Sequence, residues 1–317
     1  MQNEWKVGRK WRLINRHIRC YPCQVGNTYS EIASAADLCY NGTQQNHDFE
    51  VTSMKYGFIG LGNMASAIIR GMVRSGNFPA GSILGFNRSV GKTEALAAEV
   101  GLVPMPDIPT LVRSCDVIVL AVKPQMLPDV LPLVSPTAAQ TVITIAAGKP
   151  AAYYEAVFGE GIPVVRVMPN ISARVLEAAS GICGGKYANE AHIAIAKEMF
   201  STVGTVYDVT EPLFAAFSAL AGASGAFIHL YIDALASAGV KNGLPRPMAQ
   251  EIACQAVLGA AKLTMASDLH PIALADQVCS PGGTTIEGIH TLKRLGFESA
   301  VQQAVDAVIE KDRKLAQ

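Results

Sequence analysis

Short apolar segments alternate with longer amphipathic ones from residue 54 onward. The short segments are rich in β-branched residues and too short to be buried helices, and they lie at 56–59, 83–86, 117–121, 142–146 and 164–167. Between several of them, Ala, Leu and Ile recur every three or four residues, as on one face of a helix. Strands that alternate with helical crossovers form a parallel sheet covered on both faces. The pattern therefore predicts an α/β fold with a Rossmann-type parallel sheet.

The strand pattern stops after a last expected strand near 205–209. Residues 211–314 carry helical patterns only, so the chain changes character at this point. We therefore expect an α/β domain at 54–210 and a second, all-helical domain at 211–317.

Residues 1–53 differ from the rest of the chain. They contain both Trp residues and three of the seven Cys residues, but no run of steady periodicity. We interpret them either as a poorly ordered N-terminal extension or as an upstream stretch that is not translated in the cell. Cys20 and Cys23 form a C-x-x-C pair, yet no second pair or His cluster stands at zinc-ligand spacing, so we expect no metal site.

The 26 basic and 26 acidic side chains balance, so no surplus of Lys and Arg is present to neutralise a polyanion. This argues against nucleic acid and favours a small-molecule partner.

Half of the 317 residues are hydrophobic, enough for a large core without disulfides, and the seven Cys are not regularly spaced. We therefore expect free thiols and a reducing, cytoplasmic location.

A stretch without formal charge at 212–232 has the length of a membrane span. Gly222 and Gly225 interrupt it, and no aromatic or basic anchors bracket both ends. We interpret it as helices buried all round in a subunit interface, with His229 as an interface histidine rather than a catalytic base. We expect no membrane partner.

A glycine-rich segment follows the first expected strand and opens a helix. Its G-x-G-x-x-A spacing places Gly60 at a tight turn, Gly62 where a pyrophosphate approaches the backbone, and Ala65 where helix and sheet pack closely. The free N–H groups and the dipole at the helix start favour a phosphate there. The predicted pyrophosphate-binding residues are Ile59, Gly60, Leu61, Gly62, Asn63 and Met64.

The end of the second expected strand indicates which dinucleotide binds. NAD-binding proteins usually carry Asp or Glu there, but this chain has Asn87, Arg88 and Ser89. Arg88 supplies a cation for a 2′-phosphate, and Asn87 and Ser89 can donate hydrogen bonds. We therefore predict NADPH as the preferred cofactor, with NADH as the alternative.

Two further strand ends are expected at the same edge of the sheet, because ligands bind at the carboxyl ends of parallel strands. Small residues there would let the backbone line the nicotinamide pocket. The predicted residues are Ala121, Val122, Lys123 and Pro124 at one strand end, and Ala146, Ala147 and Gly148 at the other.

In the helical region, a glycine-rich turn at 279–283 precedes the apolar run of a helix. The backbone N–H groups of Gly282, Gly283 and Thr284 are expected to be free at the helix start and to bind a carboxylate, with the Thr285 hydroxyl beside them. By itself, the segment also fits an ordinary helix N-cap.

Several motifs occur in the order of a known family. They are G-F-I-G-x-G-N-M from Gly57, A-V-K-P-Q from Ala121, A-A-G from Ala146, R-V-M-P-N from Arg166 and S-P-G-G-T-T from Ser280. In this order they resemble pyrroline-5-carboxylate reductase over residues 54–315. S-P-G-G-T-T is the specific part, because the glycine fingerprint is shared with many dehydrogenases.

The resemblance implies NADPH-dependent reduction of 1-pyrroline-5-carboxylate to L-proline, the last step of proline biosynthesis. It also implies a homodimer with interlocked helical domains, often assembled into decamers, and active sites built across the dimer interface. It adds Glu177 as a cofactor contact, although the usual E-G-A-T surroundings of that residue are altered here. The substrate contacts it implies are Ser280, Gly282, Gly283, Thr284, Thr285 and Asp276.

The implied chemistry needs alignment more than acid–base groups. A protonated cyclic imine accepts hydride readily, so the protein has mainly to hold two bound molecules together and exclude water. We expect the turn amides to bind the substrate carboxylate, and Thr285 to be the catalytic residue that hydrogen-bonds the ring nitrogen.

One departure and two alternatives remain open. The family commonly has G-S-G-P-A where this chain has G-A-S-G-A at 222–226, which leaves the substrate range undetermined. A β-hydroxyacid dehydrogenase-like oxidoreductase would need a Lys base from the helical region, for which Lys241 and Lys262 are the candidates. A non-catalytic NADPH-binding regulator is the second alternative.

Overall fold

The computed structural model describes residues 54–316. The expectations for residues 1–53, including the extension and the Cys20 and Cys23 pair, lie outside the described residues.

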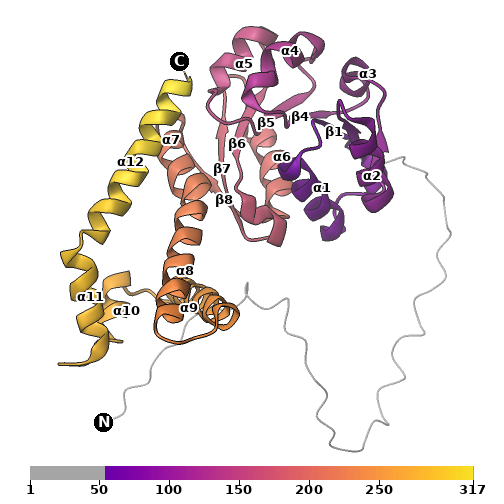
Figure 1. The fold of residues 1–317 in the computed structure, drawn as a ribbon. Coiled ribbons are helices and arrows are strands. Elements are labelled where there is room, and N and C mark those ends of the chain that lie inside the picture. The colour runs from indigo at the N-terminus through magenta and orange to yellow at the C-terminus, as the bar shows by residue number, and fades with distance from the viewer. Residues whose placement is uncertain (1–53, 317) are drawn as a thin grey trace, which may run out of the picture. The chain divides into compact units, whose positions relative to one another are not determined.

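An eight-stranded sheet forms the core of the first part of the chain (Figure 1). Its strand order is β3-β2-β1-β4-β5-β6-β7-β8. Because β1 pairs with β2 on one side and β4 on the other, the chain reverses direction across the sheet at β1, where ligands bind in such folds. The strands are β1 (Tyr56–Ile59), β2 (Ile83–Phe86), β3 (Val103–Pro104), β4 (Val117–Leu120), β5 (Thr141–Thr144), β6 (Val164–Met168), β7 (Ala178–Gly184) and β8 (Gly204–Asp208).

Helices and single turns connect these strands. The helices are α1 (Asn63–Ser75), α2 (Val90–Val100), α3 (Ile108–Arg113), α4 (Leu127–Val130), α5 (Ala151–Phe158) and α6 (Glu190–Ser201). The 3₁₀ turns are η1 (Ala80–Ser82), η2 (Pro124–Met126), η3 (Leu131–Leu133) and η4 (Ile171–Val175).

Each strand contributes to two cores, because successive side chains point to opposite faces of the sheet. Phe58 and Val119 pack with α1, α2 and α6 on one face. Ile59 and Leu120 pack with α3, α4 and α5 on the other. All four side chains are at most 1% exposed, and burying each stabilises the fold by about 1.5 to 3 kcal/mol. The first part of the chain is therefore a three-layer α/β/α domain, as predicted.

The sheet differs from the expected parallel one at β7, which runs antiparallel to β6. Only residues 169–177 separate these strands, and a parallel crossover needs a dozen or more. The sequence pattern missed β7 because its residues, A-A-S-G-I-C-G, are mostly small and have weak strand preference. It also missed β3, a two-residue edge strand.

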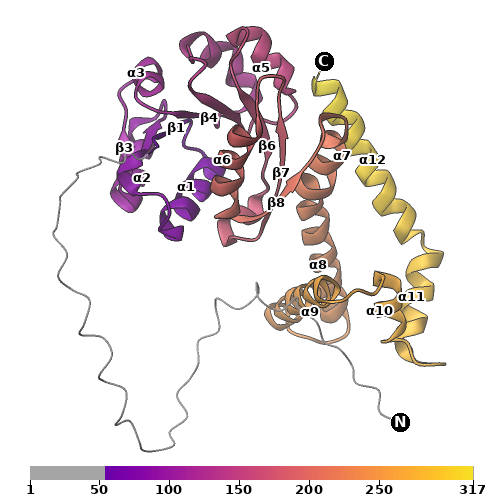
Figure 2. The same cartoon turned by 180° about the vertical axis from the view of Figure 1, so that it is seen from behind.

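Helices alone follow β8 within the described residues, as expected from the pattern. They are η5 (Glu211–Leu213), α7 (Phe214–Phe217), η6 (Ser218–Ala223), α8 (Ser224–Lys241), α9 (Arg246–Ala266), α10 (Pro271–Asp276), α11 (Thr284–Arg294) and α12 (Phe297–Ala316). Of these, η5 is a 3₁₀ turn and η6 is a π-helical turn. α8 packs on α9 around Ala236, Ala249 and Ala253, and α12 returns to contact α7 and η6 (Figure 2).

The 212–232 stretch is not buried all round by the rest of its own chain. Leu220 and Leu230 are 68% and 71% exposed, and His229 is also exposed. Within residues 54–316, the helical stretch Glu211–Lys241 is long and apolar enough to cross a membrane. Core helices of soluble proteins also meet this criterion of length and composition. A single chain therefore leaves an apolar helical surface uncovered, which is typical of an interaction site.

A buried cation joins the sheet to the first helices that follow it. Arg166 on β6 is ion-paired with Glu211, and its guanidinium lies 4.0 Å from the ring centroid of Phe214. The Arg166 side chain is 7% exposed, so the ion pair is largely removed from solvent on the arginine side. Removing Glu211 would leave the buried Arg166 charge without its partner, and the pair therefore helps to fix η5 and α7 against β6.

Candidate dinucleotide-binding site

The glycine-rich turn connects β1 to α1 where the chain reverses across the sheet. Gly60 has a φ of +97°, and a Cβ there would lie 2.8 Å from the carbonyl oxygen of Ala121. Gly62 is the N-cap of α1, and a Cβ there would meet nothing within 4 Å. Ala65, in the first turn of α1, is 1% exposed. The fold itself requires glycine at 60, whereas the space beside Gly62 suits a phosphate at the helix N-terminus.

A cavity of about 320 Å³ lies at the start of α1. Its lining comes from the segments that follow β1, β4 and β5, which meet because the carboxyl ends of parallel strands lie at one edge of the sheet. The lining residues are Gly62, Asn63, Met64, Ala65, Ala121, Val122, Lys123, Pro124, Ile145, Ala146 and Ala147. Residues predicted from three separate strand ends therefore share one cavity. Gly148 does not line it, and its φ of +83° marks a left-handed turn before α5.

An adjacent cavity of about 400 Å³ also contains Val122 in its wall. Ile59, Gly60, Asn87 and Arg88 line it, so the expected adenosine end lies beside the glycine-rich turn. Arg88 is exposed and has no ion-pair partner among the described residues. Its charge is therefore available for an anion in this cavity.

Asn87 is already engaged in hydrogen bonds within the protein. Its Oδ1 accepts from the backbone N–H of Leu61 at 3.3 Å, and its Nδ2 donates to the carbonyl oxygen of Ser89 at 3.3 Å. Asn87 therefore holds the glycine-rich turn, a role that the sequence did not indicate. Ser89 is exposed at the N-cap of α2 and is not part of the cavity lining.

The second cavity includes residues that no sequence motif indicated. Asp107, Ile108 and Pro109 come from the start of α3, and Met126 comes from η2. Asp107 caps α3 by accepting from the backbone N–H of Thr110 at 2.7 Å, and this hydrogen bond lowers the pKa of its carboxyl. The D-x-P sequence that starts at Asp107 is a local signal for this helix cap. It does not indicate that Asp107 lines the same cavity as Arg88.

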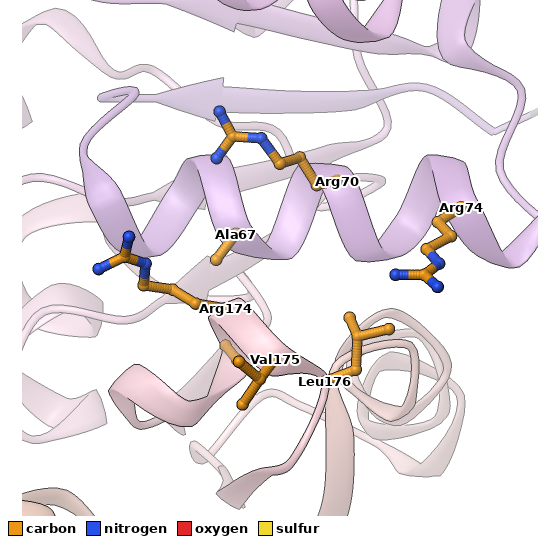
Figure 3. Close-up of a pocket in the computed structure, with 7 residues that line it drawn as sticks. Ala67, Arg70, Arg74, Arg174, Val175 and Leu176 are labelled. Carbon is orange, nitrogen blue, oxygen red and sulfur yellow. The ribbon is translucent and has the colours of Figure 1, made fainter. Parts of the chain in front are cut away.

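Glu177 lies outside both cavities, after Leu176 at the end of η4. A third cavity, of about 300 Å³, lies between α1 and η4, and its lining residues are Ala67, Arg70, Arg74, Ala173, Arg174, Val175 and Leu176 (Figure 3). Arg70 donates to Glu99 through Nε and Nη2 at 2.6 and 2.7 Å. Figure 3 shows the three guanidinium groups pointing in different directions, so they do not converge on one anion.

The turn before α11 differs in detail from the expectation. The backbone N–H of Gly283 is not free, because it donates to the Ser280 carbonyl oxygen at 3.0 Å. This bond forms because Gly282 has a φ of +67°, which folds the turn back on itself. Thr284 and Thr285 begin α11 and are exposed, as are Ser280 and Asp276. None of these residues lines either candidate dinucleotide cavity in the single chain.

Two other candidates also lie away from the cavities. Lys241 is the last residue of α8 and Lys262 lies on α9, both exposed and neither in the lining. Residues 222–226 complete η6 and begin α8 without the proline that is common in the family. Among residues 54–316, no group of three or more His, Cys, Asp or Glu side chains is placed to hold a metal ion.

The four cysteines in the described part of the chain are free thiols. Cys254 is exposed and Cys279 half-buried, whereas Cys115 and Cys183 are buried. Burial raises the pKa of Cys115 to about 12 and that of Cys183 to about 11. Both buried thiols therefore remain protonated near neutral pH and act as small apolar side chains.

The fold and the paired cavities beside the glycine-rich turn define a class, the Rossmann-type dinucleotide-binding proteins with a helical region after the sheet. Two family models match: "NADP oxidoreductase coenzyme F420-dependent" over residues 55–148 and "Pyrroline-5-carboxylate reductase dimerisation" over residues 211–315.

Relatives with established names extend the match to most of the chain. Pyrroline-5-carboxylate reductase of Methanosarcina acetivorans is 42% identical over 265 residues, 83% of this chain and 98% of the relative. The Escherichia coli enzyme of that name is 34% identical over 83% of this chain and 98% of its own. The solved Plasmodium falciparum pyrroline carboxylate reductase with NADP bound has a TM-score of 0.77, with 29% identity over 84% of this chain and 99% of its own. The chain belongs to the pyrroline-5-carboxylate reductase family.

Proposed function

We propose that this protein reduces 1-pyrroline-5-carboxylate to L-proline with NADPH, the last step of proline biosynthesis. The observation that carries the proposal is one cavity lined by three predicted cofactor segments, in a chain of this family that also retains S-P-G-G-T-T at the start of α11. Residues 54–210 would form the cofactor domain, and residues 211–317 the dimerisation and substrate domain.

The residues around the two cavities fit NADPH. The N-terminus of α1 and the unfilled space beside Gly62 suit the pyrophosphate, and Arg88 suits a 2′-phosphate. The small side chains of Ala121 and Ala146 leave room for a flat ring against the backbone. NADPH, when bound, supplies the hydride. The protein holds the reacting groups in line and excludes water, which in favourable cases lowers a barrier by about 7 to 11 kcal/mol.

The turn before α11 would bind the substrate. Helix N-termini attract carboxylates, so the start of α11 would hold the substrate carboxylate. Thr285, in the first turn, would hydrogen-bond the ring nitrogen: its hydroxyl would donate to the neutral imine, and accept from the N–H of the protonated imine during hydride transfer. No nucleophilic side chain is needed for this reaction.

The functional unit would be a homodimer, with dimers assembling further into decamers. Two features support self-association: the turn before α11 does not reach the dinucleotide cavities of its own chain, and large apolar side chains of the helical region are exposed. Among these, Met265 is 83% and Leu295 75% exposed. A second copy would cover this surface and bring its own turn to the cavity. The free thiols fit a cytoplasmic enzyme.

Turnover assays separate this proposal from its two alternatives. We expect the purified protein to consume NADPH when given 1-pyrroline-5-carboxylate and to release proline. A β-hydroxyacid dehydrogenase would instead reduce NADP when given a hydroxyacid. NADPH binding without turnover of either substrate would favour a regulator, and would overturn the proposal.

A further inference from the structure

Asn170, the last residue of the R-V-M-P-N segment, lies beyond the end of β6. β6 pairs with β5, and β5 leads into Ala146 in the wall of the cavity at the start of α1. Asn170 therefore lies at the same edge of the sheet as the predicted nicotinamide pocket. None of the roles proposed so far uses its side chain.

The Asn170 amide connects this edge of the sheet to the helical region. Its Nδ2 donates to the carbonyl oxygen of Ala221 at 2.9 Å. Ala221 belongs to η6, the π-helical turn that precedes α8. Met168, also at the end of β6, packs closely on the same turn, since its Cε would lie 3.0 Å from a Cβ at Gly222.

Two side chains donate hydrogen bonds to carbonyls of the π-helical turn. The backbone N–H of Ser224 donates to the carbonyl of Ala219, five residues earlier, and not to Leu220 as in an α-helix. The Ser224 hydroxyl donates to the Leu220 carbonyl instead. The next carbonyl, that of Ala221, receives the Asn170 amide. The Ser224 side chain thus holds the wider turn from the start of α8, and the Asn170 side chain holds it from beyond the end of β6.

The other end of the Asn170 amide is unsatisfied. Its Oδ1 is buried and has no hydrogen-bond partner among the described residues. Leaving a buried acceptor unpaired costs about 1 to 3 kcal/mol. Unpaired buried acceptors are uncommon in folded proteins, so the cost indicates that Asn170 is held in this position by its bond to η6.

We propose that Asn170 is a positioning residue for hydride transfer. It acts through the Ala221 carbonyl, which holds η6, and with it the start of α8, in a fixed place beside the nicotinamide edge of the sheet. The proposal rests on the reductase function proposed above.

The test compares N170A with N242A. Asn242 is a matched control, because its Nδ2 donates to the Ala238 carbonyl at 2.8 Å on the same helix α8, but at the far end. We expect N170A to lower kcat by about 100-fold, because small misalignments have large effects on rate. NADPH affinity should change less than about two-fold, because the pyrophosphate and adenosine cavities are untouched. N242A should keep the wild-type kcat.

A deuterium isotope effect distinguishes positioning from mere loss of folded enzyme. With NADPH carrying deuterium at the transferred position, misaligned hydride transfer makes that step slower, so the isotope effect on kcat should rise in N170A. Fewer active molecules would lower kcat and leave the isotope effect unchanged, which would contradict the proposal.

N170D provides a second variant of the same size, which keeps an acceptor but places an oxygen against the Ala221 carbonyl. We expect it to behave like N170A, and wild-type kinetics in N170D would overturn the proposal. Wild-type protein inactive with the imine would instead contradict the reductase function itself.

Discussion

Gly60 packs against the backbone of Ala121, so that a Cβ on Gly60 would lie 2.8 Å from the Ala121 carbonyl oxygen. The contact joins the glycine-rich turn after β1 to the segment after β4, and both segments adjoin the predicted dinucleotide cavities. Any side chain at position 60 must therefore move one wall of the site away from the other.

We accordingly expect Gly60→Ala to weaken NADPH binding at least about ten-fold and to destabilise the fold by about 1 to 3 kcal/mol, since the φ of +97° adds strain to the clash. NADPH titration and thermal unfolding measure the two effects. Gly76→Ala is the matched control: its φ of +77° is also left-handed, but a Cβ there meets nothing within 4 Å. Gly76→Ala should lose stability and keep its affinity, and equal affinity losses in both variants would refute the role of the contact.

Arg88 should determine the preference for NADPH over NADH. Arg88 lines the cavity at the end of β2, so Arg88→Ala should remove a charge-assisted hydrogen bond to the 2′-phosphate worth about 1.5 to 3 kcal/mol. This corresponds to a loss of about 10- to 100-fold in kcat/KM with NADPH, and little change with NADH. Arg74→Ala, an exposed arginine outside both dinucleotide cavities, serves as the control. A similar loss with both cofactors would show that Arg88 does not contact the 2′-phosphate.

Thr285→Ala should lower kcat/KM for the imine and leave NADPH affinity nearly unchanged, because the residue begins α11 and lies outside both dinucleotide cavities. Thr285→Ser should retain most of the activity if the hydroxyl is what matters. Thr291→Ala, further along the same helix and also exposed, should behave as wild type. Wild-type kinetics in Thr285→Ala would remove this residue from the mechanism.

Mixed dimers test whether two chains build each site. Gly60→Ala damages the cofactor cavity, and Thr285→Ala damages the turn before α11. If each site combines the cavity of one chain with the turn of the other, random mixing of the two variants should restore about a quarter of the wild-type sites. Activity after co-expression, compared with each variant alone, measures this. No recovery in mixtures that are shown to contain mixed dimers would indicate that each chain completes its own site.

Buried thiols should make the fold sensitive to alkaline pH. Burial raises the pKa of Cys115 to about 12, whereas an exposed thiol titrates near about 8.5. Between these values the unfolded chain loses its proton first, so the free energy of unfolding should fall as pH rises, by at most about 1.4 kcal/mol per pH unit for this group. Urea unfolding with a reductant, at about pH 7 and about pH 10, should show a smaller decrease for Cys115→Ala than for wild type.

The exposed Cys254 provides the control for this measurement. Cys254→Ala should keep the full decrease, because its thiol has water around it in the single chain. An unchanged pH dependence in Cys115→Ala would mean that other buried groups cause the decrease. Burial also raises the pKa of Cys183 to about 11, so some decrease should remain in Cys115→Ala.

The sequence by itself determined the features that depend on neighbours along the chain. β-branched runs indicated most of the strands, and the spacing of Gly60, Gly62 and Ala65 indicated a strand–turn–helix unit, because these preferences act over a few residues. The order of the motifs was enough to identify the family.

The tertiary structure decided what depends on residues far apart in the chain. The antiparallel pairing of β7 followed from the length of its connection to β6, and Asp107 joined the cavity of Arg88 only because α3 packs beside β2. The bond from Asn170 to Ala221 spans 51 positions, which no local pattern can indicate. Local periodicity reports which side of an element is apolar, but only packing in three dimensions determines which elements, and which polar atoms, meet.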